Sequence, residues 1–179
     1  MAVRILLVGV GGVSYGLIAE AAERARKRLP VETDILVPVW REHLSLEAYD
    51  FSRMQWKAWI VNSRLAERYS PLLSPPKRLL IGVVSGDGFA RGTNFVFGLA
   101  TPHLGVASIY ISRIAGDRII ERLTKLILHE TGHLLGLGHC DNPRCVMHFS
   151  NSLRELDEKG DTFCPRCTAR LKNLLDLGD

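Results

Sequence analysis

Three histidines at a fixed spacing limit the local fold of this chain more than any other sequence feature. Residues 129–139 read His-Glu-Thr-Gly-His-Leu-Leu-Gly-Leu-Gly-His. His129 and His133 are four residues apart, so on a helix they project from one face about one turn apart. Gly136 can end this helix with a left-handed backbone, which lets the chain turn back and bring His139 to the other two. The spacing therefore predicts a helix, a sharp turn and a cluster of three histidines.

This cluster has the donor set of a catalytic zinc site. Two imidazoles from one helix face and a third from the following loop leave the fourth position of a tetrahedral zinc open to water. Glu130 is rotated by one residue from His129, so it can reach a zinc-bound water without ligating the metal. We therefore predict that His129, His133 and His139 bind zinc and that Glu130 is the general base. A purely structural role for the histidines is the alternative.

All four cysteines of the chain follow the histidine cluster, as a Cys-x₄-Cys pair (Cys140 and Cys145) and a Cys-x₂-Cys pair (Cys164 and Cys167). Four thiolates close a tetrahedron, so they predict a structural zinc that holds a segment too small to build its own core. Two disulfides, unrelated buried thiols and a redox pair are the alternatives. Because Cys140 directly follows His139, we infer that the structural site positions the last histidine.

Composition and charge favour a soluble globular protein. The 179 residues are 46% hydrophobic, and the net charge of +4 comes from scattered residues that do not indicate a nucleic-acid partner. No segment approaches the roughly 18 apolar residues that cross a bilayer, so we expect no membrane partner. The N-terminus could pass for a short secretory signal, but a buried strand over residues 3–10 is the better interpretation. We therefore expect a cytoplasmic protein with reduced cysteines.

Hydrophobic patterning predicts an α/β body followed by a small tail. Apolar runs indicate strands over residues 3–10, 31–40, 79–85, 94–99 and 105–112. Helical periodicity indicates helices over residues 14–29, 53–69 and 117–135, with loops over 41–51 and 70–77. After Gly136 the chain is expected to be loop-like until a last helix over residues 165–177. These elements suggest an N-terminal subdomain, 1–137, that ends in the active-site helix, and a C-terminal subdomain, 138–179.

The extended histidine motif resembles that of the metzincin clan of zinc peptidases. Cys140 directly after it, Cys145-x-Met147 and the later Cys-x₂-Cys pair resemble one branch, the archaemetzincins, over residues 129–167. The resemblance implies an α/β, metzincin-like zincin fold: a twisted mixed sheet with backing and active-site helices and a small C-terminal subdomain held by zinc. It also implies two zinc ions, one catalytic and one structural, and makes Met147 the Met-turn residue beneath the catalytic metal.

By the same resemblance the chain is a zinc metallopeptidase that hydrolyses peptide bonds through a zinc-bound water, with a peptide or protein as substrate. Metzincins typically hold the peptide antiparallel to an edge strand, for which residues 94–99 are the candidate. His148, next to the Met-turn residue, is expected to be solvent-facing or satisfied by hydrogen bonds rather than a ligand.

Three other functions fit the sequence less well. Some ribosomal-RNA maturation nucleases also place three histidines at this spacing, but they carry Gly where this chain has Glu130. A non-catalytic, zinc-stabilised peptide-binding module would need none of the hydrolytic residues, all of which are present. Gly9-x-Gly11-Gly12 suggests a dinucleotide loop, but Ser14 stands where the third glycine should be, so we interpret it as a tight turn from strand to helix.

Overall fold

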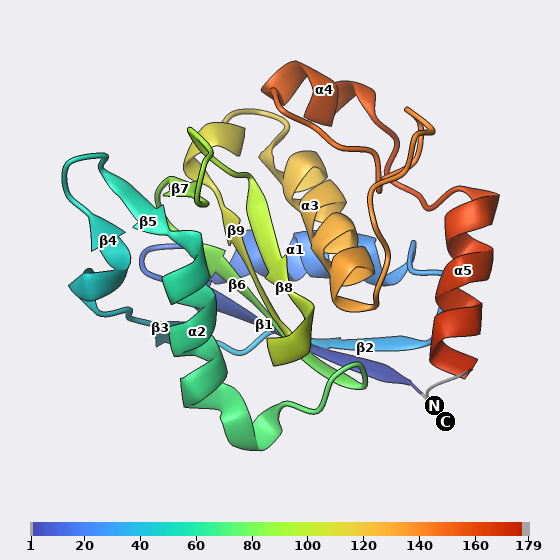
Figure 1. The fold of residues 1–179 in the computed structure, drawn as a ribbon, viewed down its shortest axis with the longest axis horizontal. Helices are drawn as coiled ribbons and strands as arrows, with labels where there is room; N and C mark the ends of the chain where they lie inside the picture. The colour runs from blue at the N-terminus through green and yellow to red at the C-terminus, as the bar shows by residue number, and fades with distance from the viewer. Residues whose placement is uncertain (1, 177–179) are drawn as a thin grey trace.

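The computed structural model describes residues 2–176 and is built around a twisted mixed sheet (Figure 1). The strand order is β2-β1-β6-β9-β8, and β3 also pairs with β1. All neighbours are parallel except β8, which runs antiparallel to β9 at one edge. The strands are β1 Val3–Val10, β2 Thr33–Leu36, β3 Arg41–Glu42, β6 Arg78–Val84, β8 Gly98–Thr101 and β9 Val106–Tyr110.

The sequence explains the central strands directly. β1 and β6 are short apolar runs rich in branched residues, and both are buried almost throughout, as central parallel strands are. Gly11, with φ +74°, turns the chain from β1 towards the first helix. The tight turn predicted for the glycine cluster is therefore present.

Helices cover both faces of the sheet. α1 (Tyr15–Arg26) and α3 (Ile119–Leu134) pack against each other and against one side of β1. α2 (Ala58–Tyr69) packs against the other side, where Val8 and Val10 point. Figure 1 shows α3 running beside the edge strand β8. This arrangement confirms the predicted mixed sheet with a backing helix and a helix that carries the histidine motif.

Two predicted elements in the first half of the chain differ from the structure. The second strand is shorter than the predicted 31–40, and the helix predicted over 53–69 begins only at Ala58. Part of the preceding segment forms a small second sheet of β4 Tyr49–Asp50, β5 Gln55–Lys57 and β7 Gly88–Phe89. The helix does not start earlier because Met54 has a left-handed backbone, with φ +55°, and the Trp56 N–H donates to the Asp87 carbonyl instead of to the preceding turn.

The predicted edge strand over 94–99 is also displaced, since β8 begins at Gly98 and ends at Thr101. The Asn94 carbonyl is taken by the side chains of Arg53 and Gln55, and Val96 forms only an isolated bridge to Gly88. Residues 94–97 therefore lead into the edge strand without belonging to it.

The C-terminal part contains a helix that the sequence reasoning missed, α4 (Leu153–Glu158). With six residues it is too short to show a periodic pattern. A capping box could have revealed it, because Ser152 accepts from the Glu155 N–H and Glu155 accepts from the Asn151 N–H. The last helix, α5, spans Pro165–Asp176, and its predicted end at residue 177 lies outside the described residues.

Within residues 2–176 no helix combines the length and the apolar character needed to span a membrane. The hydrophobic cluster on the α1–α3 side of the sheet continues into the C-terminal part, where it includes Met147, Leu156 and Leu171. The histidine motif therefore lies between the sheet and this C-terminal part.

Candidate active site

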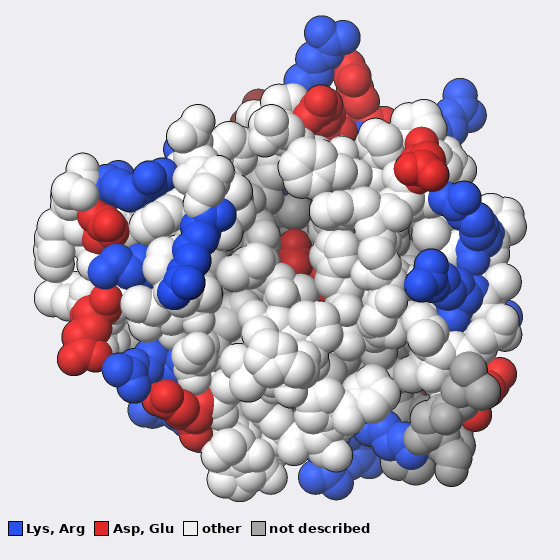
Figure 2. Space-filling model, viewed as in Figure 1, with Lys and Arg blue, Asp and Glu red and all other residues white. Residues whose placement is uncertain are grey.

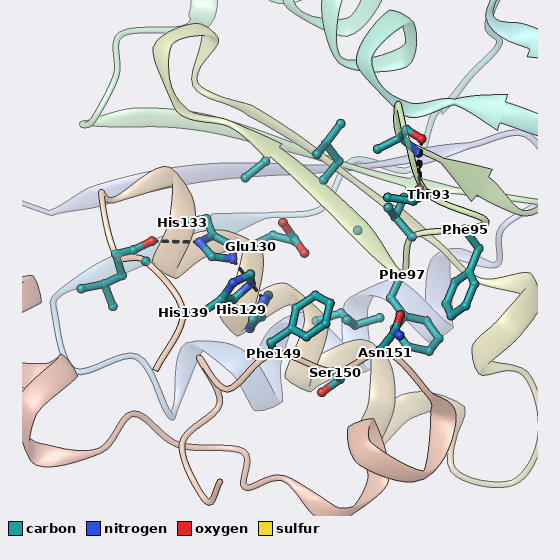
Figure 3. Close-up of a pocket in the computed structure, with 18 of the residues that line it drawn as sticks. Thr93, Phe95, Phe97, His129, Glu130, His133, His139, Phe149, Ser150 and Asn151 are labelled. Atoms are coloured by element: carbon teal, nitrogen blue, oxygen red, sulfur yellow. Dashed lines mark hydrogen bonds between the residues drawn. The ribbon is translucent and has the colours of Figure 1, made fainter. Parts of the chain in front are cut away.

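The end of α3 brings the three predicted histidines together. His129 and His133 lie on the last two turns of the helix, which stops at Leu134. Gly136 follows with φ +94°, and the Leu137 N–H donates to the Gly132 carbonyl, which is the hydrogen-bond pattern of a glycine-ended helix. The reversed chain carries His139 back, so that one ring nitrogen of each histidine lies within 4.8 Å of the others (Figure 3).

Backbone carbonyls fix the orientation of the two helical histidines. His129 Nδ1 lies 2.8 Å from the Val146 carbonyl, and His133 Nδ1 lies 2.8 Å from the Leu137 carbonyl. Both Nδ1 atoms therefore carry the proton, and the Nε2 lone pairs face each other 3.1 Å apart. Burial holds the pKa of each ring of the triad below its usual value, and that of His129 well below it. The rings are therefore neutral, as metal ligands must be.

The donor set fits a tetrahedral zinc ion. At the usual zinc–nitrogen distance, two ligand nitrogens of a tetrahedron lie about 3.3 Å apart, close to the observed Nε2 separation. Two facing ring nitrogens without protons repel each other unless a cation lies between them. Three nitrogens leave one position for water or substrate, which is the coordination of a catalytic site.

Glu130 lies beside this triad and is 3% exposed. Burial raises the pKa of its carboxyl to about 8, while the positive charge of Lys159 acts in the opposite direction. A β-carbon on Gly98, the first residue of β8, would overlap the Glu130 carboxylate. The candidate general base is thus held directly against the edge strand.

A cavity of about 920 Å³ contains the triad and Glu130. Glu130 is the one carboxylate among the described residues that line it. Figure 2 shows a hollow near the centre of this face with acidic atoms at its bottom, while most Lys and Arg side chains lie near the periphery. The walls come from β8 and the residues before it, from α3, and from the segment 149–151. A peptide in this cavity would lie between the edge strand and the histidines.

The four cysteines form a second cluster, with all Sγ atoms within 4.8 Å of one another. They are free thiols, and Cys140 Sγ lies 3.8 Å from Cys164 Sγ, the separation expected for two thiolates on one zinc. Burial acts to raise the pKa of Cys140, but hydrogen bonds from the Asn142 N–H and Arg166 bring it to about 7. The geometry matches a closed four-thiolate site and differs from that of two disulfides.

Met147 and the first cysteine connect the two clusters. Met147 is fully buried, and its carbonyl accepts from the Cys140 N–H at 3.0 Å. His148 lies outside both clusters, because its Nδ1 is 2.8 Å from the Cys140 carbonyl. It is therefore a histidine satisfied by the backbone, as the sequence suggested.

Three features of the site have no signal in the sequence. Gly98 is the contact between Glu130 and β8, and Phe149 lies with its ring 5.0 Å from that of His139. Lys159 lines the cavity although it is only 4% exposed. A single glycine, phenylalanine or lysine in a loop has no spacing pattern, so only the fold reveals these positions.

Comparison with known proteins gives consistent matches. Residues 15–173 match the family model described as "Peptidase family M54". The archaemetzincin of Aeropyrum pernix is 43% identical over 169 residues, which cover 93% of this chain and 91% of that protein. The crystal structure of archaemetzincin from Methanopyrus kandleri has a TM-score of 0.83 at 31% identity, covering 98% of this chain and 96% of that one. A zinc-dependent peptidase from Methanocorpusculum labreanum has a TM-score of 0.81 at 31% identity, covering 93% and 99%.

Proposed function

Because the chain belongs to peptidase family M54, the archaemetzincins, and is therefore a zinc metallopeptidase, we propose that Glu130 is the general base of its peptide hydrolysis. We also propose two zinc ions, a catalytic one on His129, His133 and His139 and a structural one on the four cysteines. The observation that carries the proposal is the position of Glu130. Its carboxylate lies in the same cavity as the triad, pressed against the first residue of the edge strand.

The free edge of β8 supports binding of an extended peptide. The Tyr110 N–H donates to the Phe97 carbonyl. In an antiparallel pair every second residue of a strand directs its N–H and C=O groups to the partner strand, so those of Phe97 and Leu99 face β9. The N–H and C=O groups of Gly98 and Ala100 then point away from β9, and both residues line the cavity. A substrate strand can pair with these groups and lie antiparallel to β8.

The residues of the chain divide the reaction between them. The edge strand orients the peptide so that the bond to be cleaved lies near Gly98 and Glu130. A zinc ion on the triad would supply Lewis-acid chemistry, making water acidic near neutral pH and polarising the peptide carbonyl. Glu130 accepts the proton of the attacking water and delivers it to the nitrogen of the leaving amine. The carbonyls of Val146 and Leu137 keep the imidazoles in the tautomer that can bind metal.

The proposed partner is a peptide or protein, with no nucleic acid or membrane, and the proposed location is the cytoplasm. Lys159 is the one Lys or Arg among the described residues that line the cavity. A single basic side chain does not form the positively charged surface that binds the phosphate backbone of a nucleic acid. The free thiols of the cysteine cluster support a reducing compartment.

Replacement of the proposed base tests the mechanism. In Glu130→Ala, peptide hydrolysis should fall by at least 100-fold while the zinc content stays that of the unaltered protein. Zinc is measured by atomic emission on the same samples that are assayed. Undiminished cleavage by the variant would show that Glu130 is not the base.

A further inference from the structure

The cavity contains a buried ammonium group that lacks a full set of protein partners. Lys159 Nζ donates to the His148 carbonyl at 3.1 Å. Its other neighbour is His129 Nδ1 at 3.4 Å, but that nitrogen already donates its proton to the Val146 carbonyl and cannot accept another. The charge of Glu130 attracts Lys159, but no carboxylate of residues 2–176 forms a hydrogen bond or ion pair with it. N–H groups of a buried cation are therefore left without an acceptor.

A second buried lysine shows what a satisfied ammonium looks like in this fold. Lys125 is 3% exposed, and its Nζ donates to the carbonyls of Leu156 at 3.1 Å and Asp157 at 2.9 Å. It also pairs with Glu121 at 3.0 Å. Lys125 does not line the cavity, whereas Lys159 does. The missing acceptors of Lys159 therefore point to a group that enters from the cavity.

A hydroxyl close in sequence to the Lys159 acceptor has the same deficit. Ser150 Oγ is buried and has no hydrogen-bond partner in the described part of the chain. Ser150 lines the cavity and follows His148, the residue that accepts from Lys159, by two positions. An ammonium and a hydroxyl that both lack acceptors suit one anionic ligand with two oxygens, and a peptide supplies this as a carboxylate.

The strand direction identifies which part of the substrate lies here. A peptide antiparallel to β8 runs from Ala100 towards Gly98, so the residues after the cleaved bond lie beside Phe97 and the segment before it. Figure 3 shows Ser150 and Asn151 on this side of the triad, with Phe97 nearby, while His133 lies at the opposite end. Ser150 thus lies on the leaving-group side of the substrate, and Lys159 is tied to the same segment through the His148 carbonyl.

We propose that the cavity selects peptides with a carboxylate on the residue that follows the cleaved bond, and that Lys159 and Ser150 bind this carboxylate. The inference rests on the proposed function and adds its substrate class. The carboxylate comes either from an Asp or Glu side chain or from the C-terminus of a substrate that ends at that residue. In both cases the buried site rejects the neutral amide, because the amide leaves the ammonium without a charged acceptor.

Matched peptides test the selectivity and distinguish the two sources. The zinc-loaded chain is assayed with internally quenched peptides that differ only in Glu or Gln after the cleaved bond. A second pair ends at that position with a free acid or an amide. We expect kcat/KM to favour a carboxylate by at least about tenfold in one pair or both, mainly through KM. Equal kcat/KM within both pairs would overturn the proposal.

Variants then test the residues. The measured quantity is the kcat/KM for the acidic peptide divided by that for the neutral peptide. Lys159→Met should bring this ratio to about one. Lys159→Arg should retain most of the selectivity, and Ser150→Ala should lower the ratio in part. Lys125→Met removes an equally buried ammonium outside the cavity and should leave the ratio unchanged. Because the ratio is taken within one protein sample, a loss of folded protein does not alter it. A ratio preserved in Lys159→Met would assign Lys159 a purely structural role.

Binding separates this inference from the proposed catalysis. Calorimetry on zinc-loaded Glu130→Ala measures the affinity for the same acidic and neutral peptides without turnover. Tighter binding of the acidic peptide, lost in the double variant with Lys159→Met, supports carboxylate recognition even where no hydrolysis is detected. Equal affinities for the two peptides overturn it, whatever the catalytic result.

Discussion

The sulfur of Met147 occupies the space that a side chain on Gly132 would need. A β-carbon on Gly132 would overlap Met147 Sδ and come within 3.0 Å of its Cε and 3.2 Å of Phe163 Cε1. Gly132 lies on α3 between Glu130 and His133, so this helix rests on Met147 at the level of the proposed metal ligands. Neither neighbour can move freely, because Met147 is fully buried and Phe163 is 8% exposed.

We predict that Gly132→Ala destabilises the protein although alanine favours helices. In an exposed helix this change stabilises by about 0.5–1 kcal/mol. Here the overlap with Met147 should lower the free energy of unfolding by about 1–3 kcal/mol. Urea unfolding followed by circular dichroism measures the difference. In a protein that already carries Met147→Ala, Gly132→Ala should lower the free energy of unfolding by at least about 1 kcal/mol less than it does in the unaltered protein. An equal loss in both backgrounds would exclude the contact with Met147 as the cause.

We expect zinc binding at the histidines to depend on the proposed structural zinc, whereas the structural zinc should not depend on the histidine site. The Cys140 N–H donates to the Met147 carbonyl, and Cys140 directly follows His139. We expect Cys164→Ala/Cys167→Ala to lose the structural zinc and to weaken zinc binding at the histidines by about tenfold or more. His129→Ala/His133→Ala should retain about one zinc per chain. Competition with a chromophoric chelator gives both results, and an unaltered histidine site in the cysteine variant would contradict the coupling.

Asp157 should stabilise the protein in a pH-dependent manner. It receives two hydrogen bonds from Arg122, at 2.7 and 2.8 Å, and joins α4 to α3. The Arg122 guanidinium holds the pKa of Asp157 below its usual value. The stabilisation is therefore present above about pH 4 and is lost as the pH falls through the folded-state pKa.

Asp157→Asn leaves the buried Arg122 without its charge partner, so we expect a loss of about 2–3 kcal/mol at pH 7 that shrinks towards pH 3. Urea denaturation between pH 3 and pH 7 measures this. Glu158→Gln removes an exposed ion pair with Arg154 and serves as the control, with an effect below about 0.5 kcal/mol. A loss that does not vary with pH would assign the effect to packing.

Gly98→Ala should impair catalysis and leave metal binding intact. The new methyl group overlaps the Glu130 carboxylate and displaces the proposed base, and its three nearest atoms all belong to Glu130. We expect kcat to fall by about 10- to 100-fold at unchanged zinc content. Gly12→Ala is the matched control, because a β-carbon there has no neighbour within 4 Å. Full activity in Gly98→Ala would show that Glu130 acts from another position.

Local patterns in the sequence were sufficient to identify the metal chemistry. The period of a helix places His129 and His133 on one face, and Gly136 permits the turn to His139, so the triad is defined by residues close together in the chain. The central strands follow from apolar runs in the same way. The predicted bounds of β8 were wrong, because its partner β9 ends at Tyr110 and the Ser112 N–H then donates to the Gly86 carbonyl instead of continuing the ladder.

Only the tertiary structure decided what surrounds the metal chemistry. Gly98 meets Glu130, Met147 fills the space beside Gly132, and Lys159 reaches the cavity from beyond α4. Each of these contacts joins elements that are far apart in the chain, and none of the residues belongs to a periodic pattern that specifies its partner. The sequence by itself determined which atoms can bind zinc, because ligand type and helical spacing are local. The packing of the edge strand, helix and C-terminal segment determined which carboxylate, which backbone edge and which ammonium group line the cavity.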